Sequence, residues 1–424
     1  MTLLALVIVP GLLLLMGVPI FAVLIAATLG GILLSINPVQ AIHSAMFGSL
    51  DIFPLLAVPL FIYAGDIMSR GGIARRLIDL ILSMIGAVRG ALGIATIAAC
   101  EVFSVMSGSS VACVAAIGKT MIPALQKNGY GTVFSVSLVT ATGVVDVITP
   151  PSITMIIYGI VAQQSVPQLF LAGFPAGILI GVALAIYVVW YARVKKIPVT
   201  APTERRGVRA AAKDAIWSMF APVVIFGGIY GGLFTPTEAA GVACIYAIVI
   251  SVFVHREMTL RELWTITIDS AALSAQILVI VSAAGAFAWL ITTSGYPQQL
   301  IGFVDSLQLR PWMLLMMINF ILLFVGSILE PPAAILMLTP LLTPLAHAAG
   351  VDPIHFGIIV TVNLAIGMFM PPFGLNLFAA HALFKTPLPD LYRGVMPFLF
   401  IYLAMLMLIT YVPAITLAPL ALFK

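Results

Sequence analysis

One stretch of this chain occurs twice, and each copy carries two adjacent prolines inside an apolar segment. The first copy covers residues 102–159 and contains Pro150-Pro151, and the second covers residues 323–380 and contains Pro371-Pro372. A shift of 221 residues superposes the two proline pairs. Because proline lacks a backbone donor and clashes with the carbonyl four residues back, a proline pair breaks a helix. The sequence therefore predicts two equivalent broken helices.

The composition places these breaks in a membrane. Hydrophobic residues make up 62% of the 424 residues and charged residues 8%, whereas soluble domains carry about 25% charged residues. Uncharged runs such as residues 216–235 and 396–422 are long enough to cross the hydrocarbon core of about 30 Å. We expect an all-α polytopic membrane protein with no nucleic-acid partner.

The spacing of apolar segments predicts two inverted repeats. Each repeat has five transmembrane helices and one re-entrant hairpin, which gives about ten transmembrane helices, two hairpins and two interfacial arm helices in total. The first repeat is residues 1–192, with a hairpin at 90–126 and a broken helix at 131–162. A basic loop at 193–214 leads to the second repeat, residues 215–424, with a hairpin at 311–347 and a broken helix at 353–384. The amphipathic arms are residues 70–89 and 294–310.

The first hairpin is inferred from its length and its middle. As one helix, residues 90–126 would extend about 55 Å, nearly twice the thickness of the core. The middle of this segment reads Ser107-Gly108-Ser109-Ser110, which is typical of a turn. Such a segment enters and leaves by the same face, and its backbone is tolerated where protein or a water-filled cavity surrounds it.

The distribution of basic residues predicts the orientation. Five crossings per repeat place the second repeat upside down relative to the first. With residues 193–214 in the cytoplasm, 17 of the 19 lysines and arginines fall on the cytoplasmic side, and Arg310 and Lys424 do not. Both termini are then expected in the periplasm of a bacterium, with the chain in the inner membrane.

The breaks and the hairpin turns are the candidate binding elements. The prolines are expected to free carbonyls near Asp146 and Val147 and near Gly367 and Met368, and unwound carbonyls bind coupling cations in inverted-repeat transporters. Neighbouring side chains could instead satisfy such a kink. Glu330 precedes Pro331 as a helix N-cap precedes a first-turn proline.

The hairpin turns also correspond to each other, since Ser109 falls on Glu330 under the same shift. Helix N-termini favour anions, whereas oxygen-lined turns favour a hard cation such as sodium. Together they suggest an anionic organic solute that moves with sodium.

Other polar residues at membrane depth have two interpretations each. Asp146 lies one turn before the first break and serves either function or structure, while Glu101 in the first hairpin could pair with Lys119. Asn376 follows the second break and forms either a contact between helices or a ligand. The segment 234–241, FTPTEAAG, fits a capping box with Thr235 as N-cap. The three cysteines and five histidines show no metal-ligand spacing, so neither a cofactor nor enzymatic activity is expected.

In this order and spacing, the motifs resemble those of a known family over essentially the whole chain. The motifs are SGSS, ITPPSI, GLFTPTEAAG, GSILEPPAAILMLTP and GMFMPPFGLN. They are similar to the large membrane subunit of tripartite ATP-independent periplasmic (TRAP) transporters. The resemblance implies sodium-driven uptake of an organic acid such as sialic acid, a C4-dicarboxylate or a sugar acid. It also implies a periplasmic solute-binding protein and a separate small membrane subunit of about four helices.

The resemblance further implies an elevator mechanism. A moving block at residues 90–162 and 311–384 would slide against a scaffold made of the remaining spans and the two arms. The first sodium site would combine Ser107, Gly108 and Ser109 with carbonyls near Gly143 and Asp146. The second would combine Gly326, Glu330 and carbonyls near Gly367 and Met370.

The complete candidate set for solute and ions falls into two halves. The first half is Ser107, Gly108, Ser109, Ser110, Gly143, Asp146, Thr149 and Pro150, and the second is Gly326, Ser327, Glu330, Gly367, Met370, Pro371 and Asn376. The expected sodium ligands among them are Ser107, Ser109, Gly143, Gly326, Glu330 and Gly367.

One alternative within transport stays open. A stand-alone transporter or antiporter of the same superfamily, coupled to sodium or protons, would share these features, and dependence on a binding protein separates the two. A channel fits less well, because broken inverted repeats favour alternating access. A phosphate-binding loop is absent from the sequence, so ATP is not expected as the direct energy source.

Overall fold

The computed structural model describes residues 10–14, 16–33, 40–85, 88–199 and 207–422. Nine helices in this part of the chain are long and apolar enough to cross a membrane. They confirm the predicted all-helical, multi-pass architecture. The expected first span and the middle of the basic loop fall partly outside the described residues.

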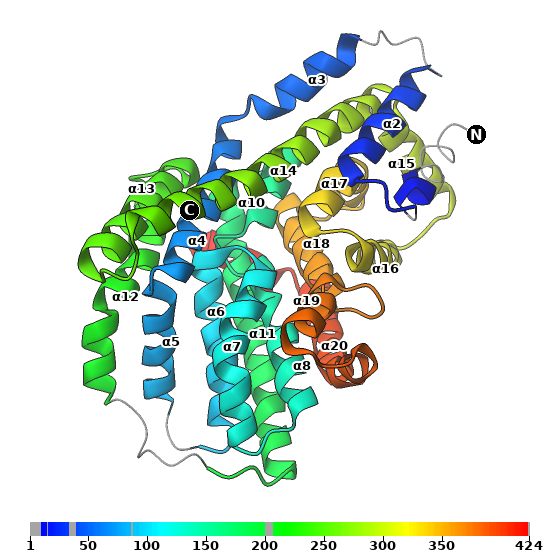
Figure 1. The fold of residues 1–424 in the computed structure, drawn as a ribbon. Coiled ribbons are helices and arrows are strands. Elements are labelled where there is room, and N and C mark those ends of the chain that lie inside the picture. Colours follow the sequence, from blue (N-terminus) through cyan, green and yellow to red (C-terminus); the bar gives the residue numbers. More distant parts are fainter. Residues whose placement is uncertain (1–9, 15, 34–39, 86–87, 200–206, 423–424) are drawn as a thin grey trace.

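The first half contains both predicted break elements (Figure 1). It begins with α2 (Ile20–Leu33), α3 (Gln40–Leu50), a short 3-10 turn (Phe53–Leu56), α4 (Ala57–Arg70) and the arm α5 (Ile73–Met84). The first hairpin is α6 (Ala91–Ser107) and α7 (Ser110–Lys127). The first broken helix is α8 (Thr132–Gly143), α9 (Val145–Ile148) and α10 (Ile153–Val161), followed by α11 (Val166–Val194).

The second half follows the same plan. It begins with α12 (Val208–Tyr230), α13 (Pro236–Ile248), a π-helical turn (Val249–Val254), α14 (Leu260–Thr293) and the arm α15 (Tyr296–Ser306). The second hairpin is α16 (Pro311–Ile328) and α17 (Pro331–Ala348). The second broken helix is α18 (Pro353–Gly367) and α19 (Leu375–Phe384), followed by α20 (Leu388–Tyr411) and α21 (Ala414–Leu422).

Equivalent elements of the two halves keep the spacing of 221 residues. Helix α7 maps onto α17 at both ends, and the last residue of α6 maps onto the last residue of α16. Helix α8 begins at Thr132, which maps onto Pro353 at the start of α18. Both predicted hairpins and both predicted breaks are therefore present. The predicted capping box at Thr235 is also present, with Glu238 bonded back to the Thr235 backbone.

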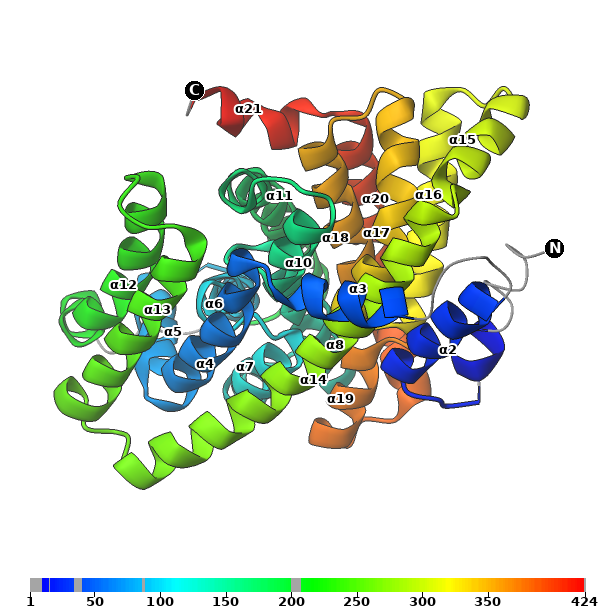
Figure 2. The same ribbon diagram turned by 90° about the horizontal axis from the view of Figure 1, so that it is seen from above.

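The predicted final span, 395–422, is wrong in its extent. Helix α20 starts earlier, at Leu388, and ends at Tyr411, and α21 is a separate short helix that packs against α11 (Figure 2). The reason is Pro413, because the residue before a proline is disfavoured in helical conformation. Val412 accordingly has φ −122° and ψ 79°.

The helices pack as two groups. The outer group consists of α2–α5 and α12–α15, in which the long helix α14 contacts α2, α3 and α4 (Figures 1 and 2). The hairpin block consists of α6–α11 and α16–α20. Within it, α11 packs on α6, α9 and α18, and α20 packs on α8 and α18. The two groups meet where α4 contacts α6 and α14 contacts α17.

This packing corrects the division implied by the family resemblance, which placed the spans at 168–192 and 395–422 in the scaffold. Helix α11 carries Gly173, Gly177 and Gly181, one per turn, and small residues at this spacing allow close helix approach. A methyl group on Gly177 would lie 2.5 Å from the Thr149 hydroxyl oxygen, and one on Gly181 would lie 2.6 Å from Glu101 Oε1. The glycines therefore seat α11 on the first hairpin and the first break.

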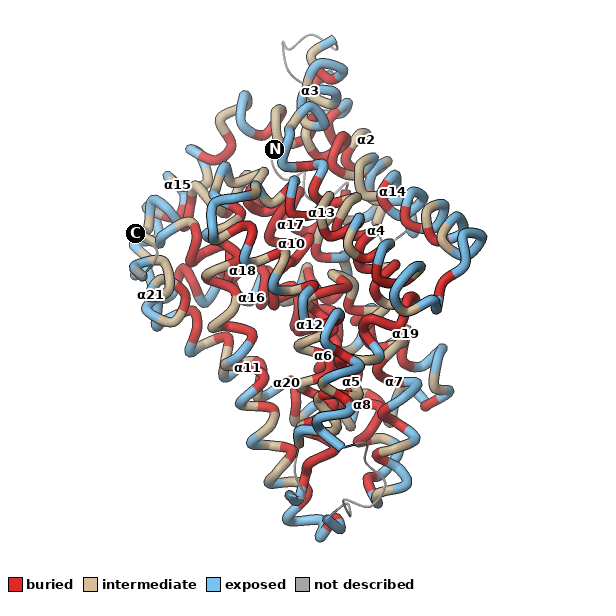
Figure 3. The backbone as a smooth tube through the Cα atoms, turned by 90° about the vertical axis from the view of Figure 1, so that its left-hand side faces the viewer, coloured by how far each residue is buried: buried red, intermediate tan, exposed pale blue. Residues whose placement is uncertain are grey.

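The first broken helix lies at the centre of the molecule. In the 18-residue window that best fits a membrane span, 89% of its residues are buried, against 33–50% for the other eight candidate spans. Figure 3 shows the buried residues gathered around α10, α17 and α18, with exposed residues toward the ends of α14 and α15. A helix that is apolar and buried on all sides is surrounded by protein rather than lipid.

Ion pairs fix the first arm to the outer group. Glu257 Oε1 accepts from both Arg75 and Arg76 at 2.7 Å, and Arg76 also lies 3.4 Å from Asp214 of α12. Only 11% of the Arg76 side chain is exposed, so this pairing is less screened than one on an open surface. The predicted amphipathic arm is thus tied to α12 and to the turn before α14.

Candidate functional site

A cavity of about 270 Å³ lies where both hairpin turns meet both breaks. The hairpin block contributes residues 107–111 and 330–332 from the turns and five residues from around the breaks: Val147, Ile153, Thr154, Met368 and Leu375. The outer group contributes Ile62 and Asp66 of α4 and Leu273 and Ile277 of α14. The cavity therefore lies between the two groups of helices and has the position expected for a solute site.

The first hairpin turn is held by its own serines. Gly108 has φ +62°, a left-handed conformation that favours glycine. The Ala112 N–H donates to the Ser109 hydroxyl at 3.4 Å, which caps α7, and the Ser109 N–H donates to the Ser107 hydroxyl at 3.3 Å. The predicted turn is confirmed, and two of its three hydroxyls also stabilise it.

The third serine joins the first hairpin to the second break. The Ser110 hydroxyl donates to Asn376 Oδ1 at 3.1 Å, although the two residues are 266 positions apart. Asn376 is fully buried, and its Nδ2 atom has no hydrogen-bond partner among the described residues. Of the two interpretations of Asn376, the structure shows the contact between helices.

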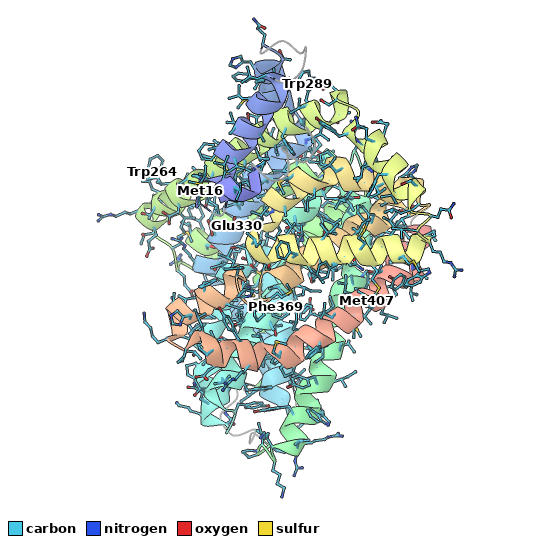
Figure 4. The ribbon with its side chains drawn as sticks, turned by 90° about the vertical axis from the view of Figure 1, so that its right-hand side faces the viewer. Met16, Trp264, Trp289, Glu330, Phe369 and Met407 are labelled. Atoms are coloured by element: carbon cyan, nitrogen blue, oxygen red, sulfur yellow. The ribbon has the colours of Figure 1, made fainter. Side chains whose placement is uncertain are left out.

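The second hairpin turn presents a carboxylate. Glu330 is the N-cap residue of α17 and Pro331 is the first helical residue, as predicted, but the Glu330 side chain makes no capping hydrogen bond. Glu330 is exposed and lines the cavity, and it lies near the middle of the molecule at the start of α17 (Figure 4). Its carboxylate is therefore available to a bound ion or solute.

The carbonyls next to the breaks are not all free. Val147 O accepts from the Ser152 hydroxyl at 2.5 Å, Gly367 O accepts from the Met370 N–H at 3.1 Å, and Met368 O accepts from the Asn376 N–H at 2.8 Å. The prediction that the prolines leave these three without a partner is wrong. The chain turns back after each proline pair, so donors beyond the break replace the lost helical bonds. Both Pro-Pro peptide bonds are cis.

Three predicted sodium ligands are packing positions outside the cavity lining. A methyl group on Gly367 would lie 2.5 Å from the Gly326 carbonyl oxygen, so α18 and α16 meet backbone to backbone. A methyl group on Gly143 would lie 2.5 Å from a methyl carbon of Val114. Among the other predicted residues, Ser327 donates to Phe324 O at 2.8 Å, and Met370 O accepts from the Gly374 N–H at 3.0 Å.

Two acids lie behind the cavity. Glu101 Oε2 accepts from the Thr149 hydroxyl at 2.8 Å. Lys119 is exposed and is not its partner, so the predicted Glu101–Lys119 pairing is wrong. Asp146 is fully buried, and neither of its carboxylate oxygens has a hydrogen-bond partner among the described residues.

Sequence reasoning missed Asp66. Its Oδ2 accepts from the Ser270 hydroxyl of α14 at 2.5 Å, and the residue lines the cavity from the outer group. The available signal was an acid inside an apolar span, which is expensive at membrane depth. With Glu330, the cavity has two carboxylates and no lysine, arginine or histidine among its described lining residues. Such a site binds cations or donor groups directly, and an organic anion only when a cation neutralises the carboxylates.

The residue next to Asp66 is expected to control movement between the two groups. A methyl group on Gly65 of α4 would lie 2.6 Å from Met106 O and 2.7 Å from Ser107 O, both backbone atoms of the first hairpin turn. We expect Gly65→Ala to reduce sodium-driven uptake at least about tenfold while the protein still inserts, since backbone atoms cannot rotate away. Uptake by membrane vesicles measures this effect. Gly241→Ala is the matched control, because its methyl group meets no atom within 4 Å, and equal uptake by both variants would contradict the expectation.

Comparison with known proteins identifies the family. The model of the "Tripartite ATP-independent periplasmic transporter, DctM component" matches residues 6–415. The C4-dicarboxylate TRAP transporter large permease protein DctM of Pseudomonas aeruginosa is 41% identical, over 91% of each chain. The isethionate TRAP transporter permease protein DctMQ of Oleidesulfovibrio alaskensis is 40% identical, and the match covers 95% of this chain and 64% of that protein.

A solved structure shows the same fold. The Alcanivorax borkumensis YdaH transporter superposes with a TM-score of 0.68 over 89% of each chain, at 14% identity. The family match spans nearly all described helices, including both hairpins and both breaks. The chain therefore belongs to the DctM family, the large permease component of tripartite ATP-independent periplasmic transporters.

Proposed function

We propose that this permease imports an organic acid anion together with sodium, and that it receives the solute from a periplasmic binding protein. The observation that carries the proposal is the cavity, which both hairpin turns, both breaks and the outer helices α4 and α14 line together. A solute in that place contacts the moving and the static parts at once, as a carrier by alternating access requires.

The charge of the cavity supports sodium coupling. Asp66 and Glu330 would repel an anion, and no basic side chain among the described lining residues offsets them. A sodium ion beside Glu330, and another at the first turn near Ser107 and Ser109, would neutralise this repulsion. Solute and sodium then bind cooperatively, because each lowers the electrostatic cost of the other.

The relatives support an organic acid but do not select one. Proteins named for C4-dicarboxylate and for isethionate transport are 41% and 40% identical to this chain, so overall identity does not separate these solutes. The sialic acid and sugar-acid classes belong to the same proposal. The choice rests on residues that line the cavity.

The partners follow from the tripartite family. We infer a separate small membrane subunit of about four helices, because this chain spans only 64% of the relative named DctMQ. A soluble binding protein would complete the system in the periplasm. The rival within transport, a stand-alone carrier, would take up solute without that protein.

We infer that the hairpin block moves as an elevator and that the two halves are inverted repeats in the inner membrane, with both termini in the periplasm. The contact of α4 with α6 and of α14 with α17 forms the interface along which the block would slide. Labelling tests the orientation. A cysteine introduced at Ala210, which is exposed, should react with an impermeant maleimide only from the cytoplasm, while the native cysteines are buried. Labelling from the periplasm would reverse the topology.

Sodium binding is tested by the melting temperature of the purified chain in sodium chloride and potassium chloride at equal ionic strength. A cation bound only by the folded protein stabilises it, by about 2.7 kcal/mol at a hundredfold excess over Kd. We expect a sodium-specific rise in melting temperature. An equal melting temperature in both salts would remove the preformed sodium site from the proposal.

A further inference from the structure

We propose that Asp146 and Glu101 form a proton-binding site inside the hairpin block, linked to sodium binding at the first hairpin turn. The inference rests on the proposed sodium coupling for the linkage but not for the proton site itself. Both carboxylates lie behind the cavity, Asp146 on α9 and Glu101 on α6.

The first step is the shortage of partners. Asp146 is 0% exposed and neither of its carboxylate oxygens is hydrogen-bonded among the described residues. Glu101 Oε2 accepts from Thr149, but its Oε1 is buried without a partner. Burying an unpaired carboxylate costs many kcal/mol, and such a group becomes neutral instead. Each acid therefore needs a bound proton or a bound cation.

The second step is the surroundings of the pair. The titratable groups that face the two acids are Cys100 of α6, Cys113 of α7 and Tyr402 of α20. Helix α11 presents Gly177 and Gly181 to this region. Among the described residues, no lysine, arginine or histidine interacts with either carboxylate. Nothing on the neighbouring helices offsets the negative charges.

The third step is a comparison within the molecule. Under the shift of 221 residues, Glu101 falls on Leu322 and Asp146 falls on Gly367. The second copy forms the same hairpin and break without an acid at either position, and it uses Gly367 for a backbone contact with Gly326. The acids are therefore not required to build this fold, and a separate role explains their presence in the first copy.

The fourth step selects the proton over a metal ion. The groups nearest the Asp146 carboxylate are the Ser104 hydroxyl and the backbone of Gly108. The Ser104 hydroxyl already donates to Cys100 O at 2.7 Å. Hard metal ions in proteins take about six oxygen ligands, and Asp146 does not line the cavity. A proton needs only the carboxylate itself.

The fifth step connects the proton to sodium. Gly108 faces Asp146 and also lines the cavity, and Val147, which follows Asp146, lines the cavity too. A sodium ion at this turn would favour the ionised carboxylate, because a nearby positive charge stabilises the negative form. Sodium binding would then release the proton from Asp146 to water, and sodium release would return it, so that one proton is exchanged per ion bound.

The site is tested on the purified full chain without any solute. Infrared spectra at neutral pH should contain a band of a protonated carboxylic acid that is lost in Asp146→Asn and weakened in Glu101→Gln. Addition of sodium chloride to the weakly buffered wild type should release about one proton per chain, whereas potassium chloride should release none. Asp146→Asn should release none with either salt. Asp51→Asn, at an exposed acid, is the matched control and should behave as the wild type does.

The outcomes separate the two proposals. An infrared spectrum in which the Asp146 band is that of an ionised carboxylate would overturn the proton site. A sodium-specific rise in melting temperature without proton release would overturn the linkage. A protonated band without any response to sodium would retain the proton site and contradict the proposed sodium coupling instead.

Discussion

Replacement of Glu330 by glutamine is expected to weaken sodium binding roughly ten- to hundredfold, with a matching loss of sodium-driven uptake. The carboxylate is exposed at the start of α17, makes no capping hydrogen bond and lines the cavity. Removing a charged ligand typically costs about 1.5–3 kcal/mol, which corresponds to that range. Titration of the melting temperature with sodium chloride measures the apparent affinity.

The same variant should fold normally. Surface substitutions away from packing contacts usually change stability by about 0.5 kcal/mol or less. Asp390→Asn is a suitable control, because Asp390 also lies in the first turn of a helix, α20, but does not line the cavity. Sodium dependence of the Glu330 variant equal to that of this control would exclude Glu330 from the ion site.

Gly367→Ala is expected to lower the free energy of unfolding by about 3 kcal/mol or more. The added methyl group would lie 2.5 Å from the carbonyl oxygen of Gly326 and 2.7 Å from its Cα. Overpacking usually costs about 1–3 kcal/mol when side chains can shift, and here both opposing atoms belong to the backbone. The second hairpin would have to separate from α18, and the second break would move with it.

Thermal unfolding in detergent, followed by expression level and by melting temperature, measures this loss. Gly241→Ala provides the comparison, because α13 leaves space around Gly241 and alanine is favoured over glycine in a helix by about 1 kcal/mol. A melting temperature for Gly367→Ala at or above that of the wild type would show that α16 and α18 do not meet as closely as described.

Sequence determined the class and the internal plan of this protein. Long apolar runs with few charges leave only a membrane for the chain, and proline pairs cannot continue a helix. These local and compositional constraints fixed both hairpins and both breaks to within a few residues. Capping chemistry is equally local, and for that reason the positions of Glu330 and Thr235 as N-cap residues were predictable.

Ligands of the site were less predictable, because partners distant in sequence decide them. The carbonyls of Val147 and Met368 are occupied by donors from beyond the breaks. Glu101 meets Thr149 rather than Lys119, since the glycines of α11 allow that helix to close over the first break. No pattern within one segment specifies these contacts.

Tertiary structure alone decided which surfaces form the cavity. The contact of Ser110 with Asn376 brings the first hairpin against the second break, and Asp66 enters from a helix that the repeat did not single out. The physical reason is that a sequence pattern reports burial and local backbone preference, whereas a binding site requires several helices at fixed relative positions. The sequence by itself thus determined a membrane-embedded chain with two equivalent broken helices, and the packing of the two groups of helices determined where an ion and a solute can meet.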